Sequence, residues 1–174
     1  MGEGQSEAFV QAHYRGVYRF LFWLCHDADT AADLTQETFM AFWASLRRPG
    51  GIGEQDPKSW LYGIARNRWR KRCRDAHPER RLPLEAAEAM RDEDAAPDAV
   101  LLRRLEAEQV VAALRELARD LREALALRVW EELSYAEIAA ALGISEGLAR
   151  WRVHRARQRL AARLAEQEEK AGAA

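Results

Sequence analysis

Residues 133–160, LSYAEIAAALGISEGLARWRVHRARQRL, decide the fold because they read as two short helices joined by a tight turn. Ser134, with Glu137 three residues later, predicts a capped helix start in which each side chain satisfies a free backbone amide of the other residue. Gly143 stands where the chain must reverse, a position that favours a residue able to adopt positive φ. We therefore expect a second helix to open near Ser145.

The second helix of this pair combines an apolar stripe with a cationic outer surface. Its buried stripe is predicted to consist of Ala149, Val153, Ala156 and Leu160. Between residues 148 and 163 there are six basic residues and no acidic residue, a balance of +6. A basic, solvated helix in an ordinary bundle is one interpretation. The small Ala139 facing the turn, Gly143 and the capped helix starts favour the other, a helix-turn-helix that places its second helix in a DNA major groove.

Composition limits the remaining possibilities. A chain of 174 residues with 48% hydrophobic residues, 32% charged residues and five prolines suits one or two small helical domains. The net charge of −1 hides strong segregation. Residues 58–77 hold seven basic residues and one acidic residue, a balance of +6, whereas residues 78–109 hold five basic and nine acidic residues, a balance of −4. Two cationic segments thus flank an acidic connector.

Several classes of protein are disfavoured. No signal peptide is visible, and no apolar run reaches the roughly 18 residues that span a bilayer, so we expect a cytoplasmic protein without membrane insertion. Cys25 and Cys73 are too few for a disulfide framework, and Cys25-His26 lacks the spaced partners of a zinc site. We expect a buried thiol at Cys25, no metal and no cofactor.

In the first half, a helix is predicted over residues 7–25 and another over residues 31–46, capped by Asp29 or Thr30. The inner stripe of the second helix is expected to be Leu34, Thr38, Ala41, Phe42 and Ser45. Met40 and Trp43 point elsewhere, beside Asp33, Gln36 and Glu37. Large apolar residues among acids suggest a surface that docks another protein. A second packing seam inside the domain is an equal alternative.

A third helix is predicted over residues 58–74, where Asp56 can cap the start and Pro57 occupies the first helical position. The glycine-rich loop before it, residues 47–56, lacks the GxxxxGK[ST] pattern of a phosphate-binding loop. The inner side of the helix is expected to be Trp60, Leu61, Ile64, Ala65 and Arg68, and the outer side Arg66, Asn67, Trp69, Arg70, Lys71 and Arg74. Cations interleaved with indoles suit nucleic acid, because cations neutralise phosphates and indoles stack on unpaired bases. Packing within the bundle is an equal alternative for Trp60, whereas we expect Trp69 to face outward.

The predicted architecture is all-α, with two small helical domains joined by an acidic flexible linker. The linker, residues 78–97, holds three of the five prolines. Helices are expected over residues 99–117 and 120–130, ahead of the helix-turn-helix. The domains therefore comprise residues 1–77 and 98–166, followed by a frayed tail at 167–174.

Three segments resemble motifs of the extracytoplasmic-function (ECF) sigma factors, the smallest type in the bacterial sigma-70 family. DLTQETFMAFW at 33–43 is similar to the family's D-L-x-Q-E-x-F-x-x-x-W motif, and WLYGIARNRWRKRCR at 60–74 to the W-L-x-x-I-A-x-N helix that follows it. Residues 132–160 resemble the family's terminal helix-turn-helix. The resemblance covers residues 9–165, and the order of the three motifs makes it specific.

The resemblance implies a protein that performs no bond chemistry, binds core RNA polymerase, directs it to promoters and helps to open the −10 element. It implies docking on the clamp helices of the largest polymerase subunit by Asp33, Gln36, Glu37, Met40 and Trp43. It implies capture of the −10 non-template strand by the loop 47–56 and by Trp60, Arg66, Asn67, Trp69, Arg70 and Lys71. It implies reading of the −35 duplex by Arg150, Trp151, His154, Arg155 and Arg157.

The resemblance further implies that the acidic linker passes through the polymerase interior, and that a separate anti-sigma factor controls the protein. This sequence departs from the family pattern at three places. Leu148 and Trp151 replace small or polar residues, which suggests an unusual −35 sequence. Leu117-Ala118 lacks the Leu-Pro that often opens the following helix, and we expect no regulatory domain after residue 170.

Two other classes of function stay open from the sequence. A stand-alone helix-turn-helix regulator with a helical sensor domain would explain residues 133–160 but not the second cationic helix or the acidic linker. A small enzyme acting through Cys25-His26 or Glu37 is the other class. Local spacing places no base beside either nucleophile, so we expect the protein not to be an enzyme.

Overall fold

The computed structural model describes residues 3–76 and 113–172, and within these ranges the ordered elements are helices without strands. In chain order they are α1 (Glu3–Cys25), α2 (Ala28–Leu46), α3 (Pro57–Ala76), α6 (Arg119–Val129), α7 (Tyr135–Leu142) and α8 (Glu146–Gly172). The all-α prediction is confirmed. The predicted linker at 78–97 lies outside the described residues, as does most of the helix expected at 99–117, of which residues 113–116 are seen as helical.

Helices α1, α2 and α3 form the N-terminal half around fully buried side chains such as Phe20, Phe42 and Leu61. Helix α2 begins earlier than predicted because Asp27, not Asp29 or Thr30, caps it. The Asp27 carboxylate accepts a hydrogen bond from the Thr30 amide at 2.8 Å. The chain reverses sharply at His26, whose φ is 56°, so only two residues separate the end of α1 from the start of α2.

The buried stripe of α2 is wider than predicted. Thr35 and Phe39 are buried together with the expected Leu34 and Thr38, whereas Ala41 is only half-buried. The reason is that α2 packs against both α1 and α3, so more than one narrow face is covered. The buried threonine hydroxyls are satisfied within the helix, with Thr35 donating to the Ala31 carbonyl at 2.7 Å.

Helix α3 starts at the predicted aspartate-proline signal. Asp56 accepts hydrogen bonds from the Ser59 amide at 2.7 Å and the Ser59 hydroxyl at 2.8 Å, and Pro57 is the first helical residue. The prediction that Trp69 faces outward is wrong for this arrangement, because its side chain is 4% exposed within the core. The C-terminal half covers this side of α3, which the local spacing of residues could not indicate.

In the C-terminal half, the predicted helix-turn-helix is present with its expected signals. Ser134 and Glu137 form a reciprocal capping box, and Gly143 ends α7 in the left-handed region with a φ of 65°. The predicted stripe of α8 is buried, and it consists of Ala149, Val153, Ala156 and Leu160. The expected frayed tail after residue 166 is wrong, since α8 continues to Gly172. Leu164, 4% exposed, extends the buried stripe by one more turn and thereby supports the longer helix.

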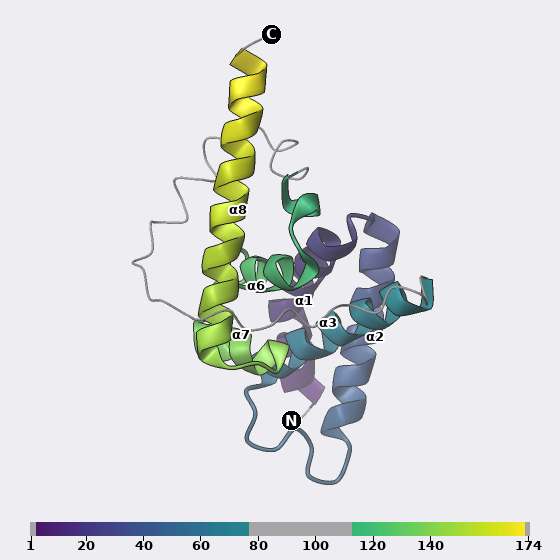
Figure 1. The fold of residues 1–174 in the computed structure, drawn as a ribbon. Helices are drawn as coiled ribbons and strands as arrows, with labels where there is room; N and C mark the ends of the chain where they lie inside the picture. The colour runs from purple at the N-terminus through teal and green to yellow at the C-terminus, as the bar shows by residue number, and fades with distance from the viewer. Residues whose placement is uncertain (1–2, 77–112, 173–174) are drawn as a thin grey trace.

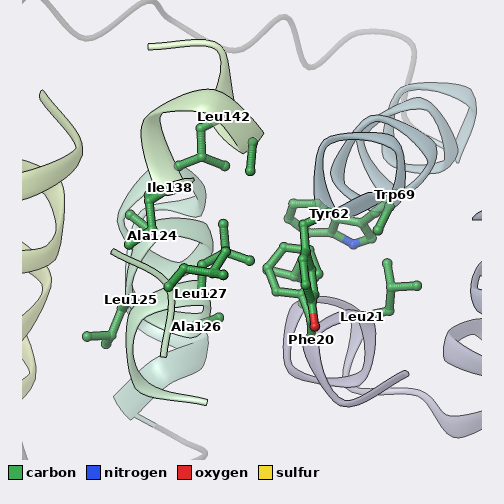
Figure 2. Close-up of a cluster of buried hydrophobic side chains, with 14 of the residues drawn as sticks. Phe20, Leu21, Tyr62, Trp69, Ala124, Leu125, Ala126, Leu127, Ile138 and Leu142 are labelled. Atoms are coloured by element: carbon green, nitrogen blue, oxygen red, sulfur yellow. The ribbon is translucent and has the colours of Figure 1, made fainter. Parts of the chain in front are cut away.

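The two halves pack directly on each other, with α6 beside α1 and α7 beside α3 (Figure 1). Figure 2 shows Phe20, Tyr62 and Trp69 of the N-terminal half facing side chains of α6 and α7. Helix α7 approaches α3 so closely that a Cβ atom at Gly63 would lie 3.1 Å from the Ala141 carbonyl oxygen. Glycine at this position therefore allows the backbones of the two halves to approach.

Candidate nucleic-acid and protein interfaces

The outer face of α2 presents an acidic surface with one prominent apolar side chain. Asp33 and Gln36 are exposed. Met40 is 71% exposed, more than any other large hydrophobic side chain in the described ranges. Glu37 is partly exposed and lies 3.5 Å from the Arg68 guanidinium. An unburied methionine among acids is what a docking surface requires, because its apolar area is still available for burial.

Trp43 behaves differently from Met40. It is half-buried against Phe9, with ring centroids 6.4 Å apart at 72°, and against Phe42 at 5.3 Å and 69°. The sequence left open a docking surface or an internal packing seam for Met40 and Trp43, and the structure is consistent with a different interpretation for each residue. Trp43 takes part in internal packing and is only partly exposed, whereas Met40 is largely exposed to solvent.

On α3, Asn67 and Lys71 are exposed, as a nucleic-acid contact requires. Trp60 is half-buried, and its indole N–H donates to the Ser45 hydroxyl at 3.1 Å, which fixes the ring against α2. In the preceding loop, Gly50 and Gly53 adopt φ values of 82° and 63°, and a Cβ atom there would meet nothing within 4 Å. The glycines therefore serve the backbone path of the loop and not a close contact inside this chain.

Arg66 and Arg70 of α3 point toward the C-terminal half, where they pair with acids of α6. Arg66 Nε lies 2.8 Å from Glu123 Oε2. Arg70 donates from Nε to Glu123 Oε1 and from Nη2 to Glu123 Oε2, both at 2.7 Å, and also contacts Asp120. Burial lowers the pKa of Arg70, but the hydrogen bonds and charges of Glu123 and Asp120 outweigh it, and the net pKa is raised.

The Glu123 carboxylate is fully buried between these two guanidinium groups. Asp120 reaches a third arginine, because its Oδ2 lies 2.9 Å from Arg152 Nη2 on α8. We call these five side chains, Arg66, Arg70, Asp120, Glu123 and Arg152, the interdomain ion cluster. It joins the third helix of the first half to the DNA-reading helix predicted in the second.

Glu131 forms a second contact between the halves. Its carboxylate accepts hydrogen bonds from Arg19 at 2.8 Å and from the Tyr62 hydroxyl at 2.5 Å. Burial, together with the hydrogen bond and charge of Glu131, raises the pKa of Tyr62, so the phenol stays protonated and donates. Nearby, Trp23 of α1 stacks on Trp130 with centroids 4.6 Å apart and planes 8° from parallel.

The outer side of α8 carries the residues predicted to read duplex DNA. Arg150 is exposed, lies 5.2 Å from the Tyr135 ring centroid and is 3.4 Å from the Glu146 carboxylate. Trp151 is half-buried against the core and not fully outward. The Tyr135 ring, contacted also by Arg128 at 5.0 Å, therefore supports Arg150 from α7.

About two turns further along α8, Gln158 links two of the predicted reading residues. Its amide nitrogen lies 3.0 Å from His154 Nε2, and its amide oxygen lies 3.4 Å from Arg155 Nη1. Arg155 is exposed, and His154 and Arg157 are half-buried. The structure thus brings Arg150, His154 and Arg155 to one surface of α8, with Arg157 closer to the domain.

Sequence reasoning missed the acids that join the two halves. Asp120 and Glu123 are three residues apart on one face of α6, and Arg66 and Arg70 are four residues apart on α3. The sequence alone shows two acids at helical spacing in α6 and two arginines at helical spacing in α3. What was not visible was that the segments meet, because they are separated by some fifty residues of sequence.

Other kinds of site find little support in the part of the chain that the structure describes. No group of three or more His, Cys, Asp or Glu side chains there is placed to hold a metal ion. Cys25, expected to be buried, is half-buried, with its sulfur 3.3 Å from the Asp27 carbonyl oxygen. Among the helices at 3–76 and 113–172, none has the length and apolar content needed to cross a membrane.

Comparison with known families matches both halves of the chain. Residues 9–78 match the family model described as "Sigma-70 region 2", and residues 107–160 match "Sigma-70, region 4". The chain is 34% identical over 165 residues to the ECF RNA polymerase sigma factor SigE of Mycolicibacterium smegmatis, covering 88% of this chain and 59% of SigE. It is 34% identical over 172 residues to the probable RNA polymerase sigma-C factor of Mycobacterium bovis, covering 92% of this chain and 84% of that protein.

A solved structure has the same overall arrangement of helices. The sigma factor RpoE of Bartonella quintana, crystallised in complex with the anti-sigma factor NepR, superposes with a TM-score of 0.66 at 28% sequence identity. The match covers 91% of this chain and 95% of that one. The likeness therefore extends over both halves and not over the helix-turn-helix alone.

Proposed function

The chain belongs to the ECF sigma factors of the sigma-70 family, and from this premise we propose that it binds core RNA polymerase and directs it to a specific class of promoters. Sigma factors are transcription initiation factors and not enzymes. The observation that carries the proposal is the presence, in one chain, of a region 2 domain and a region 4 domain, each with its own cationic helix.

Polymerase docking is assigned to the outer face of α2. Asp33, Gln36 and Glu37 supply polar contacts, and Met40 supplies exposed apolar area. Trp43 contributes the part of its side chain that internal packing leaves exposed. The clamp helices of the largest polymerase subunit are the partner proposed for this face.

The −10 element is assigned to α3 and the loop before it. Asn67 and Lys71 are exposed and able to contact DNA directly in the arrangement seen. Arg66, Arg70 and Trp69 face the C-terminal half, so their contact with DNA requires the halves to separate. Flipping a base costs a few kcal/mol, and stacking on an aromatic side chain such as Trp60 returns about 1–3 kcal/mol per base.

The −35 element is assigned to α8. Arg150, His154 and Arg155 lie on one surface and are proposed to contact base edges in the major groove. Arg157, closer to the domain, is proposed to contact the DNA backbone. Trp151, half-buried, is proposed to alter the −35 sequence that is preferred by restricting what fits beside it.

Control by an anti-sigma factor is also proposed for this chain. The support comes from the structural relative RpoE, which was crystallised with the anti-sigma factor NepR and shares the arrangement of both halves. The alternative function, a stand-alone helix-turn-helix regulator, is not favoured because residues 9–78 match sigma-70 region 2 and not a sensor domain.

Run-off transcription tests the proposal. Purified chain is added to core RNA polymerase on fragmented genomic DNA, and the transcripts are mapped to their start sites. We expect new starts that share paired −35 and −10 sequences and that are lost with core polymerase alone. Core polymerase that initiates at the same sites with and without the chain would refute the proposal. A chain that shifts a DNA fragment but does not bind core polymerase would support the regulator instead.

A further inference from the structure

The interdomain ion cluster uses the arginines assigned to DNA for a different contact. Arg66 and Arg70 lie on the −10 helix α3, and in the structure both are paired with Glu123 of α6. A guanidinium group cannot hold a buried carboxylate and a DNA phosphate in the same geometry at once. We infer that the acidic face of α6, formed by Asp120 and Glu123, is an internal competitor that occupies the −10-binding arginines in place of promoter DNA. This inference rests on the proposed function of α3.

The geometry of the pairing supports competition. Arg70 donates from Nε and Nη2 to the two oxygens of Glu123, both at 2.7 Å, which is the two-pronged contact that arginine also makes with phosphate. Arg66 donates a third hydrogen bond to the same carboxylate at 2.8 Å. Glu123 therefore presents to α3 the charge and the paired acceptor oxygens of a phosphate group.

The burial of Glu123 makes this contact specific. Its side chain is fully buried, and a buried carboxylate is strongly unfavourable unless cations are placed beside it. Asp120, 28% exposed, contacts Arg70 and holds Arg152 of α8 at 2.9 Å, so the same acidic face ties both cationic helices to α6. Separation of the halves would release Arg66 and Arg70 together, whereas the Asp120–Arg152 pair lies within the C-terminal half and would stay.

The contact is also of a kind that can be reversed. The desolvation of a buried ion pair offsets much of its attraction, so such pairs add little net stability even though removal of one partner is strongly destabilising. The rest of the boundary combines apolar packing, including the Trp23–Trp130 stack, with the hydrogen bonds that Arg19 and Tyr62 donate to Glu131. A partner that binds the separated halves, such as core polymerase, must supply the free energy of this packing, while the ion pairs add little to it.

The test compares the wild-type chain with Glu123→Gln and with the matched control Glu132→Gln. Glu132 is exposed and its substitution removes the same single charge from the same half of the chain. Binding to a fluorescein-labelled oligothymidylate is measured by anisotropy across a salt series, and the radius of gyration is measured by small-angle X-ray scattering. The full-length chain is used throughout.

We expect Glu123→Gln to expand the chain and to tighten oligothymidylate binding at least about tenfold, because the open state no longer has to be selected from a minor population. Two released phosphate contacts should steepen the slope of log K against log salt concentration by about 1.4, at about 0.7 for each contact on a single strand. Glu132→Gln should match the wild type in size and change affinity far less. Adding Arg66→Ala and Arg70→Ala to Glu123→Gln should return the affinity to the wild-type value.

The inference is overturned if Glu123→Gln expands the chain but binds DNA no better than Glu132→Gln, or if the wild-type chain is already as extended as the variant. Should Glu123→Gln fail to fold by circular dichroism, Asp120→Asn, whose side chain is partly exposed, replaces it. This variant removes one acidic partner of Arg70 and leaves Glu123 in place, so we expect a smaller gain in oligothymidylate binding in the same direction, and no gain over Glu132→Gln would overturn the inference. A gain in oligothymidylate binding by a chain that never initiates with core polymerase would keep the competition and refute the proposed function. A chain that initiates normally with core polymerase, but whose Glu123→Gln variant binds oligothymidylate no better, would refute the competition and keep the proposed function.

Discussion

Substitution of Met40 by alanine should separate polymerase docking from folding. The Met40 side chain is 71% exposed on the outer face of α2, so it contributes little to the packed domain. A surface substitution of this kind changes the free energy of unfolding by about 0.5 kcal/mol or less. The same exposed area is what a docked partner would cover.

The expected loss of affinity follows from that exposed area. Complete burial of a methionine side chain is worth about 1.5–3 kcal/mol, and since most of it is still uncovered, docking can gain about 1–2 kcal/mol from it. Met40→Ala should therefore raise the dissociation constant for core polymerase by about 5- to 30-fold. Met40→Leu keeps a similar apolar volume and should stay within a few-fold of the wild type.

Competition against a fluorescently labelled wild-type chain measures both variants on core polymerase without DNA. Thermal unfolding, followed by circular dichroism, verifies that the fold is retained. If Met40→Ala and Met40→Leu bind core polymerase equally well, the outer face of α2 is not the docking surface. Binding of a −35 duplex should be unchanged in both variants, since α8 is untouched.

Three further outcomes are expected. Gly143→Ala should lower the free energy of unfolding in denaturant by about 1 kcal/mol. The cause is the left-handed φ of 65° and not a steric clash, because a Cβ atom there would meet nothing within 4 Å. Gly143→Asn should lower the free energy of unfolding less, because asparagine tolerates this conformation better. Hydrogen bonds from Ser134 lower the pKa of Glu137, so the capping box should add stability above about pH 4.3, the unfolded value, and lose it as pH falls through the lower folded pKa. Ser134→Ala should make the free energy of unfolding depend less on pH in this range. A variant with the same pH profile of stability as the wild type would contradict the role assigned to the capping box. Arg150→Ala should weaken −35 binding by about 1–3 kcal/mol at one base pair, measured with a panel of single-base-pair variants. Arg157→Ala, at the residue proposed to contact the DNA backbone, should instead weaken binding to all members of the panel equally.

The parts of the fold that local sequence determines were predictable. Ser134, Glu137 and Gly143 specify the start and end of α7 within a few residues, and the structure has the predicted capping box and left-handed glycine. The aspartate-proline start of α3 was predicted for the same reason, because the cap and the fixed φ of proline act within one turn. Family motifs then supplied the functional expectations that local signals alone left open.

The parts that depend on contact between the halves were not predictable. Trp69 was expected outside, because the spacing within α3 cannot indicate that α6 and α7 cover that face. Arg66 and Arg70 were predicted on the outer side of α3 for the same reason, although both pair with Glu123. The length of α8 was underestimated because the polar composition after residue 166 masked the support that Leu164 gives to the helix.

Two glycines inside helices lie where the halves approach each other closely, and their presence or absence can be compared among the sequences of other sigma factors. Gly63 of α3 faces the Ala141 carbonyl oxygen, and Gly16 of α1 leaves room for the Glu131 carboxylate and the Tyr62 hydroxyl. Each glycine weakens its own helix by about 0.5–1 kcal/mol relative to alanine, a cost that a permanently extended chain would have no reason to retain. Sigma factors with glycine at both positions should therefore share this folded-back form, and those with bulkier residues should keep their halves apart.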